Sequence, residues 1–512
     1  MNIAIIGAGV SGLTTAYYLM KNAPAGTVNI TIYEASAIIG GNADTVEVSL
    51  PMPDGSLKSR WVDFGVNDFN LSTYTALVTL WEELGIMQDM GQSCPESSYC
   101  SPLIDTESFA FPGQNNDYAY RYTVQADGSI VSPPGSTAKA DILYNDIQMF
   151  EKLLAQWYTD HKPEKDYHIS VAEWLAMCNY RFSEDFINYN LYPRINGMYF
   201  TVEQPIGSGI PVPSAMPMWM VGHYYILQEA YGQKITPDCP RQYFVGGSVR
   251  WLDVLATTLV GMGVTIQSNT PIDAIASSGD QMVVVLPGGS GAFFDKVVLA
   301  THADTTLKLM NYNFSGDTMV QLLGGFNYST CPIYIHQDPR FLAQRDFDCT
   351  YNIHAYDYTQ QLPTFPYTIS YIVNYHQNDP AAGINDPLFF LSINPYWTQG
   401  QAPANMLNFA DGSGPAIGSL SHCTLNTTSL NAQIGIFDIQ FLEQADRQYY
   451  FCGSFTVGAG LHEECILNSI DMATKILNPS WVPPGVSKGG KRDSAPQYIL
   501  DAIKRMEAKK KG

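Results

Sequence analysis

Three glycines near the N-terminus have a spacing that could bind a phosphate group. Gly7, Gly9 and Gly12 form a G-x-G-x-x-G pattern directly after the apolar run Ile3 to Ile6, which is typical of a buried parallel strand. In this pattern the first glycine makes a tight turn, the second lets a pyrophosphate approach the backbone, and the third lets a helix pack closely on the strand. A helix from about Ser11 to Met20 would direct its free N–H groups at the phosphates. The stretch therefore predicts a dinucleotide-binding turn.

An acidic residue and a glycine pair narrow the choice of nucleotide. Glu34 follows a second apolar run, Val28 to Tyr33, at about the twenty-residue distance expected for an acid that binds a ribose hydroxyl. A carboxylate there would repel a 2′-phosphate, which disfavours NADP but leaves NAD and FAD open. Gly40 and Gly41 would let the backbone close over a second face of a longer dinucleotide.

Two later segments show the same pattern of a strand followed by a turn as the first. KVVLATHAD (Lys296 to Asp304) indicates a buried strand that runs into a turn, and the segment Tyr449 to Leu477 indicates a strand, a glycine-rich turn and a helix. One nucleotide-binding domain interrupted twice explains this order. A ligand with a second, reactive end would touch the final glycine turn, which favours FAD because its isoalloxazine is held far from its adenine.

The expected order of strands and helices around these segments predicts an α/β protein. A Rossmann-like FAD-binding domain would be interrupted by a mixed-sheet and helical substrate domain. A chain of 512 residues is too long for one core. Helices are expected over 71–84, 138–158 and 171–177, and long strands over 367–376 and 387–397. The predicted parts are 1–85, 239–305 and 441–480 for the FAD-binding domain, 86–238 (helix-rich) and 306–440 (sheet-rich) for the substrate domain, and 481–512 for a basic C-terminal tail.

Composition and charge exclude several classes of partner. The net charge of −21 argues against nucleic acid, and no apolar stretch approaches the length of a membrane span. The tail carries eight basic and three acidic residues, and Gln497 to Gly512 predicts a short basic amphipathic helix. A solvated terminus is favoured over a peripheral membrane or partner contact. The absence of a signal-like start predicts a cytoplasmic protein, or a secreted one if Met1 replaces a removed signal peptide. A homodimer is possible as the oligomeric state. Cysteine spacing predicts no metal site.

Five motifs together resemble the FAD-dependent amine-oxidase superfamily, which also includes phytoene desaturases and protoporphyrinogen oxidases. The motifs are GAGVSGL, GGNADTV, VDFGVNDFN, VVLATHAD and YYFCGSFTVGAGLHEE. Within it, the chain is most similar to FAD-binding oxidoreductases encoded near cyclopropane-fatty-acid synthases and to FAD-dependent polyunsaturated fatty acid isomerases. The resemblance implies a flavoprotein enzyme with FAD as its cofactor, either an oxidoreductase or an isomerase of lipid metabolism.

The resemblance also assigns cofactor contacts by position. Those near the adenosine and the pyrophosphate would be Gly7, Gly9, Ser11, Gly12, Glu34 and Ile272. Those near the phosphates, the ribityl chain or the second cofactor turn would be Gly40, Gly41, Asn42, Ala300 and Thr301. Those near the flavin ring would be Phe64, Gly65, Gly453, Gly460, Leu461 and His462. N–H groups at the start of the last helix would stabilise negative charge on reduced flavin.

Two departures from the family pattern bear on the reaction. Amine oxidases typically place a lysine near flavin N5 in the later substrate-domain strands, but Lys308 is the single lysine between residues 305 and 440 and falls in a helical pattern. Cys452, Gly453 and Ser454 stand where A-G-E is common, and Glu463 and Glu464 could compensate. Oxidation of simple amines with oxygen is therefore disfavoured.

Three functions follow as alternatives. Hydride transfer from a hydrophobic substrate to flavin N5 is expected, with double-bond isomerisation of an unsaturated fatty acid slightly favoured. The alternatives are a flavin oxidase or dehydrogenase of an amine or other small apolar substrate, and a non-catalytic flavin-binding protein. The candidate catalytic residues are His462, Trp219, Tyr396 and Trp397. His302 is expected to support the cofactor turn, and His223 and His376 to be structural or surface residues.

Overall fold

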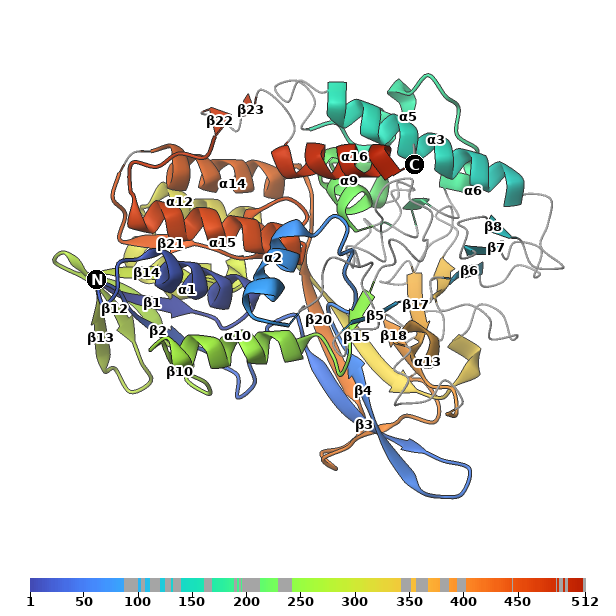
Figure 1. Cartoon of the computed structure of the whole chain (residues 1–512), viewed down its shortest axis with the longest axis horizontal. Coiled ribbons are helices and arrows are strands. Elements are labelled where there is room, and N and C mark those ends of the chain that lie inside the picture. The colour runs from blue at the N-terminus through green and yellow to red at the C-terminus, as the bar shows by residue number, and fades with distance from the viewer. Residues whose placement is uncertain are drawn as a thin grey trace.

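Two sheets with separate cores lie side by side in the computed structural model (Figure 1). The structure describes residues 1–86, 100–102, 106–110, 120–124, 130–131, 140–160, 168–187, 191–192, 195, 212–228, 242–341, 351–355, 367–377, 386–393, 402–443, 445–484, 486–487, 491–492 and 496–509. Mixed helices and sheets around a parallel sheet confirm the predicted α/β fold.

The first sheet is parallel and contains the N-terminal strand at its centre. Its order is β10 (Thr265–Gln267), β2 (Asn29–Tyr33), β1 (Asn2–Ile6), β14 (Lys296–Leu299) and β21 (Tyr449–Phe451). The side chains of Ile3, Ile5, Ile32, Val297 and Val298 are completely buried, as expected for a parallel sheet that is covered on both faces. Strands from three distant stretches of sequence therefore form one sheet.

Helices cover this sheet, and among them a helix from the N-terminal region packs against one from the C-terminal region. Helices α1 (Val10–Asn22), α10 (Val249–Gly261) and α15 (His462–Leu477) pack against one another and the sheet, and the Ser469 hydroxyl donates to the Ser11 carbonyl. The same core contains the helices and the small antiparallel sheet that surround the strands. These elements are α11 (Ala303–Phe314), α12 (Thr318–Leu322), α14 (Thr427–Phe437), β11 (Ala274–Ser278), β12 (Gln281–Val285) and β13 (Gly291–Phe294).

The second sheet has eight strands and forms the opposite side of the molecule. Their order is β20 (Ile417–Cys423), β15 (Tyr328–His336), β18 (Phe390–Ile393), β17 (Tyr367–Ile372), β16 (Tyr351–Ala355), β6 (Thr106–Ala110), β7 (Tyr120–Val124) and β8 (Ile130–Val131). The strand predicted over 367–376 was too long: it ends at Ile372 and continues as the short helix α13 (Val373–His376). There the side-chain oxygen of Asn374 accepts from the backbone N–H of Phe389 and replaces the backbone carbonyl that a continuing strand would supply.

A long hairpin joins the two cores. β3 (Thr45–Pro51) and β4 (Leu57–Asp63) pair with each other and with β19 (Asn408–Phe409), and the hairpin extends downward in Figure 1. Its apolar side chains pack with Ile333 and Leu391 of the eight-stranded sheet. The hairpin belongs by sequence to the first predicted FAD-binding part and by packing to the second core. The division into domains remains a prediction.

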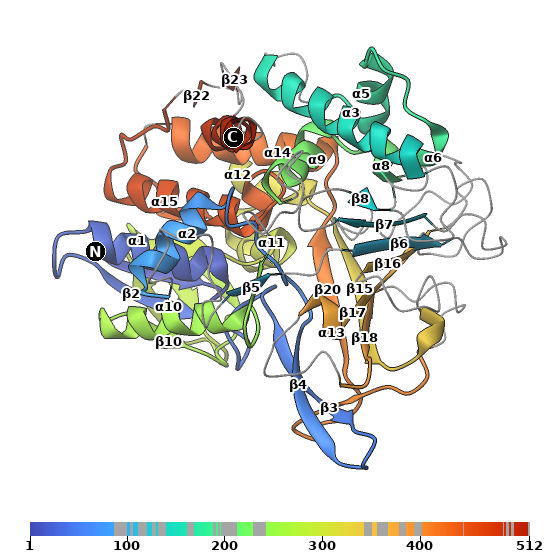
Figure 2. The same ribbon diagram turned by 45° about the vertical axis from the view of Figure 1, so that its right-hand side comes forward.

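Helices rich in aromatic residues cover the upper part of the molecule (Figure 2). They are α3 (Ala140–Asp160), α5 (Val171–Met177), α6 (Glu184–Phe186) and α9 (Met218–Leu227), and the short α8 (Val212–Ala215) packs beside α5. Helix α2 (Thr75–Glu83) lies lower, against α15 (Figure 2). The three helices expected from the amphipathic pattern at 71–84, 138–158 and 171–177 are confirmed as α2, α3 and α5. β5 (Cys100–Pro102) pairs with β9 (Gln242–Phe244).

The C-terminal helix corrects the expectation of a solvated tail. After the short strands β22 (Val486–Ser487) and β23 (Lys491–Arg492), α16 (Gln497–Lys509) packs against α9 and α3. Ile499, Ala502 and Ile503 are at most 2% exposed. The basic side of the helix was visible in the sequence, but the apolar side is covered by the protein itself. Within the described stretches, no helix combines the length and the apolar character needed to cross a bilayer.

Candidate active site

The glycine pattern forms a close contact between β1, α1 and β14. A Cβ atom on Gly12 would lie 2.0 Å from the Gly7 carbonyl oxygen, and one on Gly7, whose φ is +105°, would lie 2.7 Å from the Ala300 carbonyl oxygen. At Gly9 the nearest atom to such a Cβ is 3.7 Å away. The first and third glycines therefore serve packing within the protein, whereas the second leaves open space beside the N-terminus of α1. This arrangement suits a pyrophosphate.

Glu34 lies at the carboxyl end of β2 beside this turn. Its Oε2 accepts from the backbone N–H of Ala8 at 2.8 Å, and its Oε1 accepts from that of Ser36 at 2.8 Å. Each carboxylate oxygen keeps a second lone pair for a hydroxyl group. The Gly40 N–H donates to the Ala8 carbonyl at 3.0 Å, which brings the glycine pair against the first turn.

One cavity connects the residues of all three segments. It has a volume of about 380 Å³ and extends from Glu34 and the glycine turns to Tyr371 and Leu391 of the eight-stranded sheet. Most of the cofactor contacts assigned from sequence line it: Gly7, Gly9, Ser11, Glu34, Gly40, Gly41, Asn42, Phe64, Gly65, Ala300, Thr301, Gly453, Gly460, Leu461 and His462. Gly12 and Ile272 are not among its described lining residues.

Of the candidate catalytic aromatic residues, the structure describes Trp219 alone, and Trp219 lies away from the cavity. Trp219 is 4% exposed and does not line the cavity among the described residues; its ring stacks on Tyr158 with centroids 4.9 Å apart. Tyr396 and Trp397 lie outside the described residues. Of the four candidates, His462 alone is placed by the structure at the cavity.

His462 begins α15 with its side chain among aromatic rings. The ring centroids of Phe69 and Trp251 are 5.4 and 5.7 Å from that of the imidazole. Burial lowers the pKa of His462 to about 3, because the charged form would lose its hydration. The imidazole is therefore neutral near pH 7, and its Nδ1 has no hydrogen-bond partner in the described part of the protein.

The turn before α15 forms the cavity wall next to His462. The chain leaves β21 at Phe451 and returns to the cavity at Ala459, Gly460 and Leu461. Gly460 has a φ of +77°, and a Cβ there would lie 2.8 Å from the Ser454 carbonyl oxygen. A non-glycine residue would thus be strained and would clash with backbone. Glycine meets both requirements, a positive φ and the absence of a Cβ atom, and so allows the turn to be compact.

Comparison with known proteins identifies the family. A sequence model of flavin containing amine oxidoreductases matches residues 10–331, which is more than half of the chain. The chain belongs to this family. It is therefore a FAD-dependent enzyme of the oxidoreductase class, and the amine-oxidase resemblance, the FAD cofactor and the fold predicted from the sequence are confirmed.

Individual relatives are distant. Coproporphyrinogen III oxidase of Staphylococcus aureus (strain NCTC 8325 / PS 47) is 24% identical over 321 residues, 59% of this chain, and the chain spans 60% of that relative's length. Cyclohexylamine oxidase from Brevibacterium oxydans IH-35A is similar in structure with a TM-score of 0.57, 14% identity and coverage of 93% of this chain and 98% of that one. A CLA-producing fatty acid isomerase from P. acnes gives a TM-score of 0.56, 14% identity and coverage of 92% and 98%. These likenesses show the fold.

The far wall of the cavity in this flavin containing oxidoreductase is largely apolar. Its described residues beyond the cofactor turns include Tyr74, Tyr224, Gln228, Tyr371, Leu391, Ile393, Leu420 and His422. No lysine or arginine is among the described lining residues. Lys308 lies on α11 with its side chain 77% exposed and pairs with Asp304 at 3.4 Å, so it does not take the place of the usual lysine.

The two glutamates after the cofactor turn bind backbone rather than lining the cavity. Glu463 accepts from the N–H groups of Ala76 and Leu77 at the start of α2, and burial raises its pKa to about 7. Glu464 accepts from the N–H groups of Ala459 and Leu461 in the cofactor turn itself. Neither glutamate is among the described lining residues of the cavity, and the suggestion that they compensate for the missing acid of A-G-E remains a hypothesis.

Sequence reasoning missed Asp63, a buried carboxyl group that lines the cavity. It accepts hydrogen bonds from Thr45, from the backbone N–H and hydroxyl of Ser248, and from the Gln377 amide at 2.7 Å. Burial raises the pKa of Asp63 to about 7, and these hydrogen bonds oppose the shift. The motif VDFG was recognised for its Phe64 and Gly65, and a charged residue inside an apolar strand end was the signal that could have identified Asp63.

Of the other histidines considered in the sequence, His302 lines the cavity, whereas His223 and His376 are not among its described lining residues. His302 precedes α11 and its ring stacks on Tyr328 with centroids 4.6 Å apart. Burial lowers the pKa of His302, so it too favours the neutral form. His223 is 2% exposed and His376 is 3% exposed, which excludes a surface position for both.

Proposed function

We propose that this enzyme removes a hydride from an activated C–H bond of an apolar small molecule, and we favour double-bond isomerisation of an unsaturated fatty acid. One observation supports the proposal above others: residues 309–440, which supply the far wall, contain no lysine. FAD, when bound, supplies a hydride acceptor at N5 that can also return the hydride. Loss of a hydride from an allylic carbon and its return to the other end of the allyl system would move the double bond without net oxidation.

The residues of the chain suit a reaction that needs no strong base. Leu391, Ile393 and Leu420 would hold an apolar chain and exclude water from it. The neutral imidazole of His462 adds no positive charge that would oppose cation character in the substrate. The backbone N–H groups at the start of α15 would stabilise negative charge on the cofactor side.

Oxidation of an amine is the second candidate, and a specific observation favours it. The charged side chains among the described lining residues are all acidic: Glu34, Asp63 and Asp68. Such residues would attract a cationic amine, whereas a fatty acid carboxylate would have to bind away from them. The match to the flavin containing amine oxidoreductases also favours this candidate, whereas the comparison that suggests the isomerase is a distant structural likeness, to the fatty acid isomerase from P. acnes.

A titration of the purified flavoprotein distinguishes the candidates. Linoleic acid and a panel of amines are added under anaerobic conditions while flavin absorbance is followed, and diene absorbance is followed in air. Conjugated diene without lasting bleaching or peroxide is the expected result. Bleaching by an amine that oxygen reverses with peroxide release would replace the isomerase with an oxidase, and an inert flavin across the panel would indicate a flavin-binding protein.

A variant pair on β20 tests the apolar wall directly. Leu420→Phe enlarges a side chain that lines the cavity, whereas Ile417→Phe enlarges one on the same strand that is 47% exposed and does not line it. We expect L420F to lower turnover of a long apolar substrate with unchanged flavin absorbance, and I417F to leave turnover unchanged. Equal turnover in both variants would contradict binding along this wall.

A further inference from the structure

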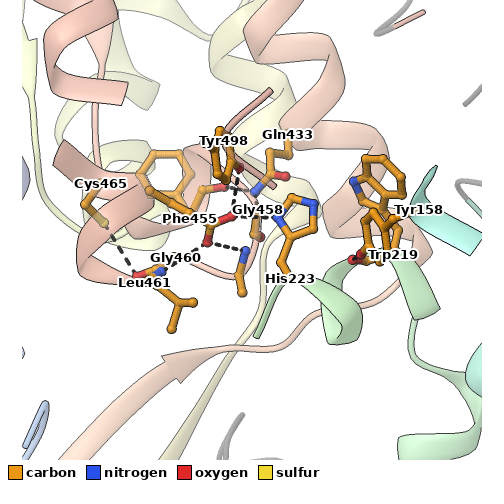
Figure 3. Close-up of polar contacts among 12 residues, drawn as sticks. Tyr158, Trp219, His223, Gln433, Phe455, Gly458, Gly460, Leu461, Cys465 and Tyr498 are labelled. Carbon is orange, nitrogen blue, oxygen red and sulfur yellow. Dashed lines mark hydrogen bonds and ion pairs between the residues drawn. The ribbon is translucent and has the colours of Figure 1, made fainter. Parts of the chain in front are cut away.

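The C-terminal helix reaches the back of the cofactor turn. The Tyr498 hydroxyl on α16 donates to Oε1 of Glu464 at 3.0 Å, although the two residues belong to different helices (Figure 3). The same oxygen receives His223 Nδ1, from α9, at 2.6 Å. Glu464 is completely buried, and His223 is 2% exposed. A buried carboxylate is thus held by side chains from two helices outside the FAD-binding sheet.

The other oxygen of this carboxylate binds the turn. Glu464 Oε2 accepts from the N–H groups of Ala459 at 2.9 Å and Leu461 at 3.3 Å. Ala459 and Leu461 both line the cavity, while Glu464 lies behind them. Four donors therefore converge on one carboxylate, which has about four lone-pair sites in all. Each donor that is lost leaves the buried charge less satisfied.

The turn has no room to shift on its inner side. Gly458 has a φ of +46°, and a Cβ there would lie 1.9 Å from Glu464 Oε1 and 2.7 Å from His223 Nδ1. Gln433 Nε2 donates to the carbonyls of Phe455 at 3.1 Å and Gly458 at 3.3 Å from α14. Figure 3 shows Tyr498 and His223 approaching this point from different sides. The turn is consequently fastened from behind by residues that do not touch the cavity.

We propose that Tyr498 and His223 are positioning residues that act through Glu464 to hold the Gly458–Leu461 turn in the conformation that binds FAD. The C-terminal helix is then a component of the cofactor site rather than an appendage. The inference rests on the proposed contact of this turn with the flavin, and it does not depend on which substrate the enzyme oxidises or isomerises.

The test compares two tyrosine variants without any substrate. Tyr498→Phe removes the hydroxyl group and keeps the aromatic ring. Tyr180→Phe is the matched control, because the Tyr180 hydroxyl donates to the Asp146 carboxylate at 2.7 Å away from the turn. FAD affinity is measured by fluorescence quenching on the FAD-free protein, the flavin midpoint potential by dye equilibration, and amide exchange over residues 458–461 by mass spectrometry.

We expect Y498F to weaken FAD binding about tenfold, which corresponds to about 1.4 kcal/mol. Its midpoint potential should fall, because a less ordered turn would hold the N–H groups at the start of α15 less firmly beside reduced flavin. Amide exchange over the turn should rise. Y180F should match the wild type in all three. In a Glu464→Gln background the additional effect of Y498F should shrink, because the tyrosine acts through that carboxylate.

Wild-type affinity, potential and exchange in Y498F would overturn the inference, and so would an undiminished effect of Y498F in the E464Q background. Failure of the proposed function would be seen separately, as a protein that binds FAD normally and leaves every substrate unchanged.

Discussion

A single methyl group at Gly12 should separate helix α1 from the parallel sheet. The added Cβ would lie 2.0 Å from the Gly7 carbonyl oxygen and 3.3 Å from Ala300 Cβ. Real Cβ atoms stay more than 3.0 Å from such atoms, so α1 or the turn would have to move by about 1 Å. Because the nearest contacting atom belongs to the backbone and cannot rotate away as a side chain could, we expect Gly12→Ala to cost about 1–3 kcal/mol of unfolding free energy or more.

Gly9 provides the matched substitution with the opposite expectation. Its φ of −83° suits any residue, and the nearest atom to a Cβ would be 3.7 Å away. Gly9→Ala should therefore leave the FAD-free protein as stable as the wild type. Its methyl group would occupy the space beside the N-terminus of α1 where a pyrophosphate is proposed to bind. We expect FAD affinity to fall at least about tenfold, a loss of about 1.4 kcal/mol.

Two measurements on each variant separate these effects. Thermal unfolding of the FAD-free protein reports packing, and FAD titration reports the cradle. G12A should lose both stability and affinity, whereas G9A should lose affinity alone. Wild-type FAD affinity in G9A would refute the placement of the pyrophosphate, and wild-type unfolding of G12A would refute the claim that the third glycine serves helix packing.

Three further predictions concern other parts of the protein. The pKa of Asp63 rises from 3.8 to about 7 on folding, so its contribution to stability is complete below pH 3.8 and is lost as the pH rises through 7. The unfolding temperature of Asp63→Asn should therefore rise relative to that of the wild type as the pH is raised from about 5 to about 8. A difference between the two unfolding temperatures that does not change with pH would contradict this. Lys308→Met should leave reoxidation of the photoreduced protein by oxygen unchanged in a stopped-flow measurement, because that side chain is exposed; a marked slowing would place Lys308 near the flavin. Gly222→Ala should lower the unfolding temperature of the FAD-free protein, since its Cβ would lie 2.5 Å from the Tyr158 ring and overpacking costs about 1–3 kcal/mol; an unchanged temperature would show that Tyr158 moves freely.

The nucleotide-binding half was predictable because its signals are local. The turn from Gly7 to Gly12 follows an apolar strand and begins a helix within a few residues, and each glycine has its own steric reason. The return of similar segments near residues 296 and 449 predicted that the same domain continues there, but it did not predict the order of the strands in the sheet. Short-range pattern and backbone geometry determine these elements together.

Contacts between distant segments were not predictable from one sequence. Asp63 binds Ser248 and Gln377, which lie 185 and 314 residues away. Glu464 binds His223 across 241 residues. An aromatic stripe such as the one around Trp219 likewise does not reveal whether it faces a ligand or a packed core. For α16, the amphipathic pattern predicted the helix, but only the position of α9 shows what covers its apolar face.

The acids of this enzyme bear on how it could stabilise reduced flavin. Where the family commonly has A-G-E, this chain has Ser454, an uncharged residue that lines the cavity. The nearby carboxylates of Glu463 and Glu464 instead bind the backbone of α2 and of the cofactor turn. The described side chains that the turn presents to the cavity are therefore neutral. The N–H groups of Ala459, Gly460 and Leu461 already donate within the protein, so N–H groups that stabilise negative charge on a bound cofactor would be those at the start of α15. Hydride removal from an amine and from an allylic carbon would both benefit. The two candidates therefore differ in the far wall, to which residues 309–440, a stretch of sequence without lysine, contribute Leu391 and Ile393.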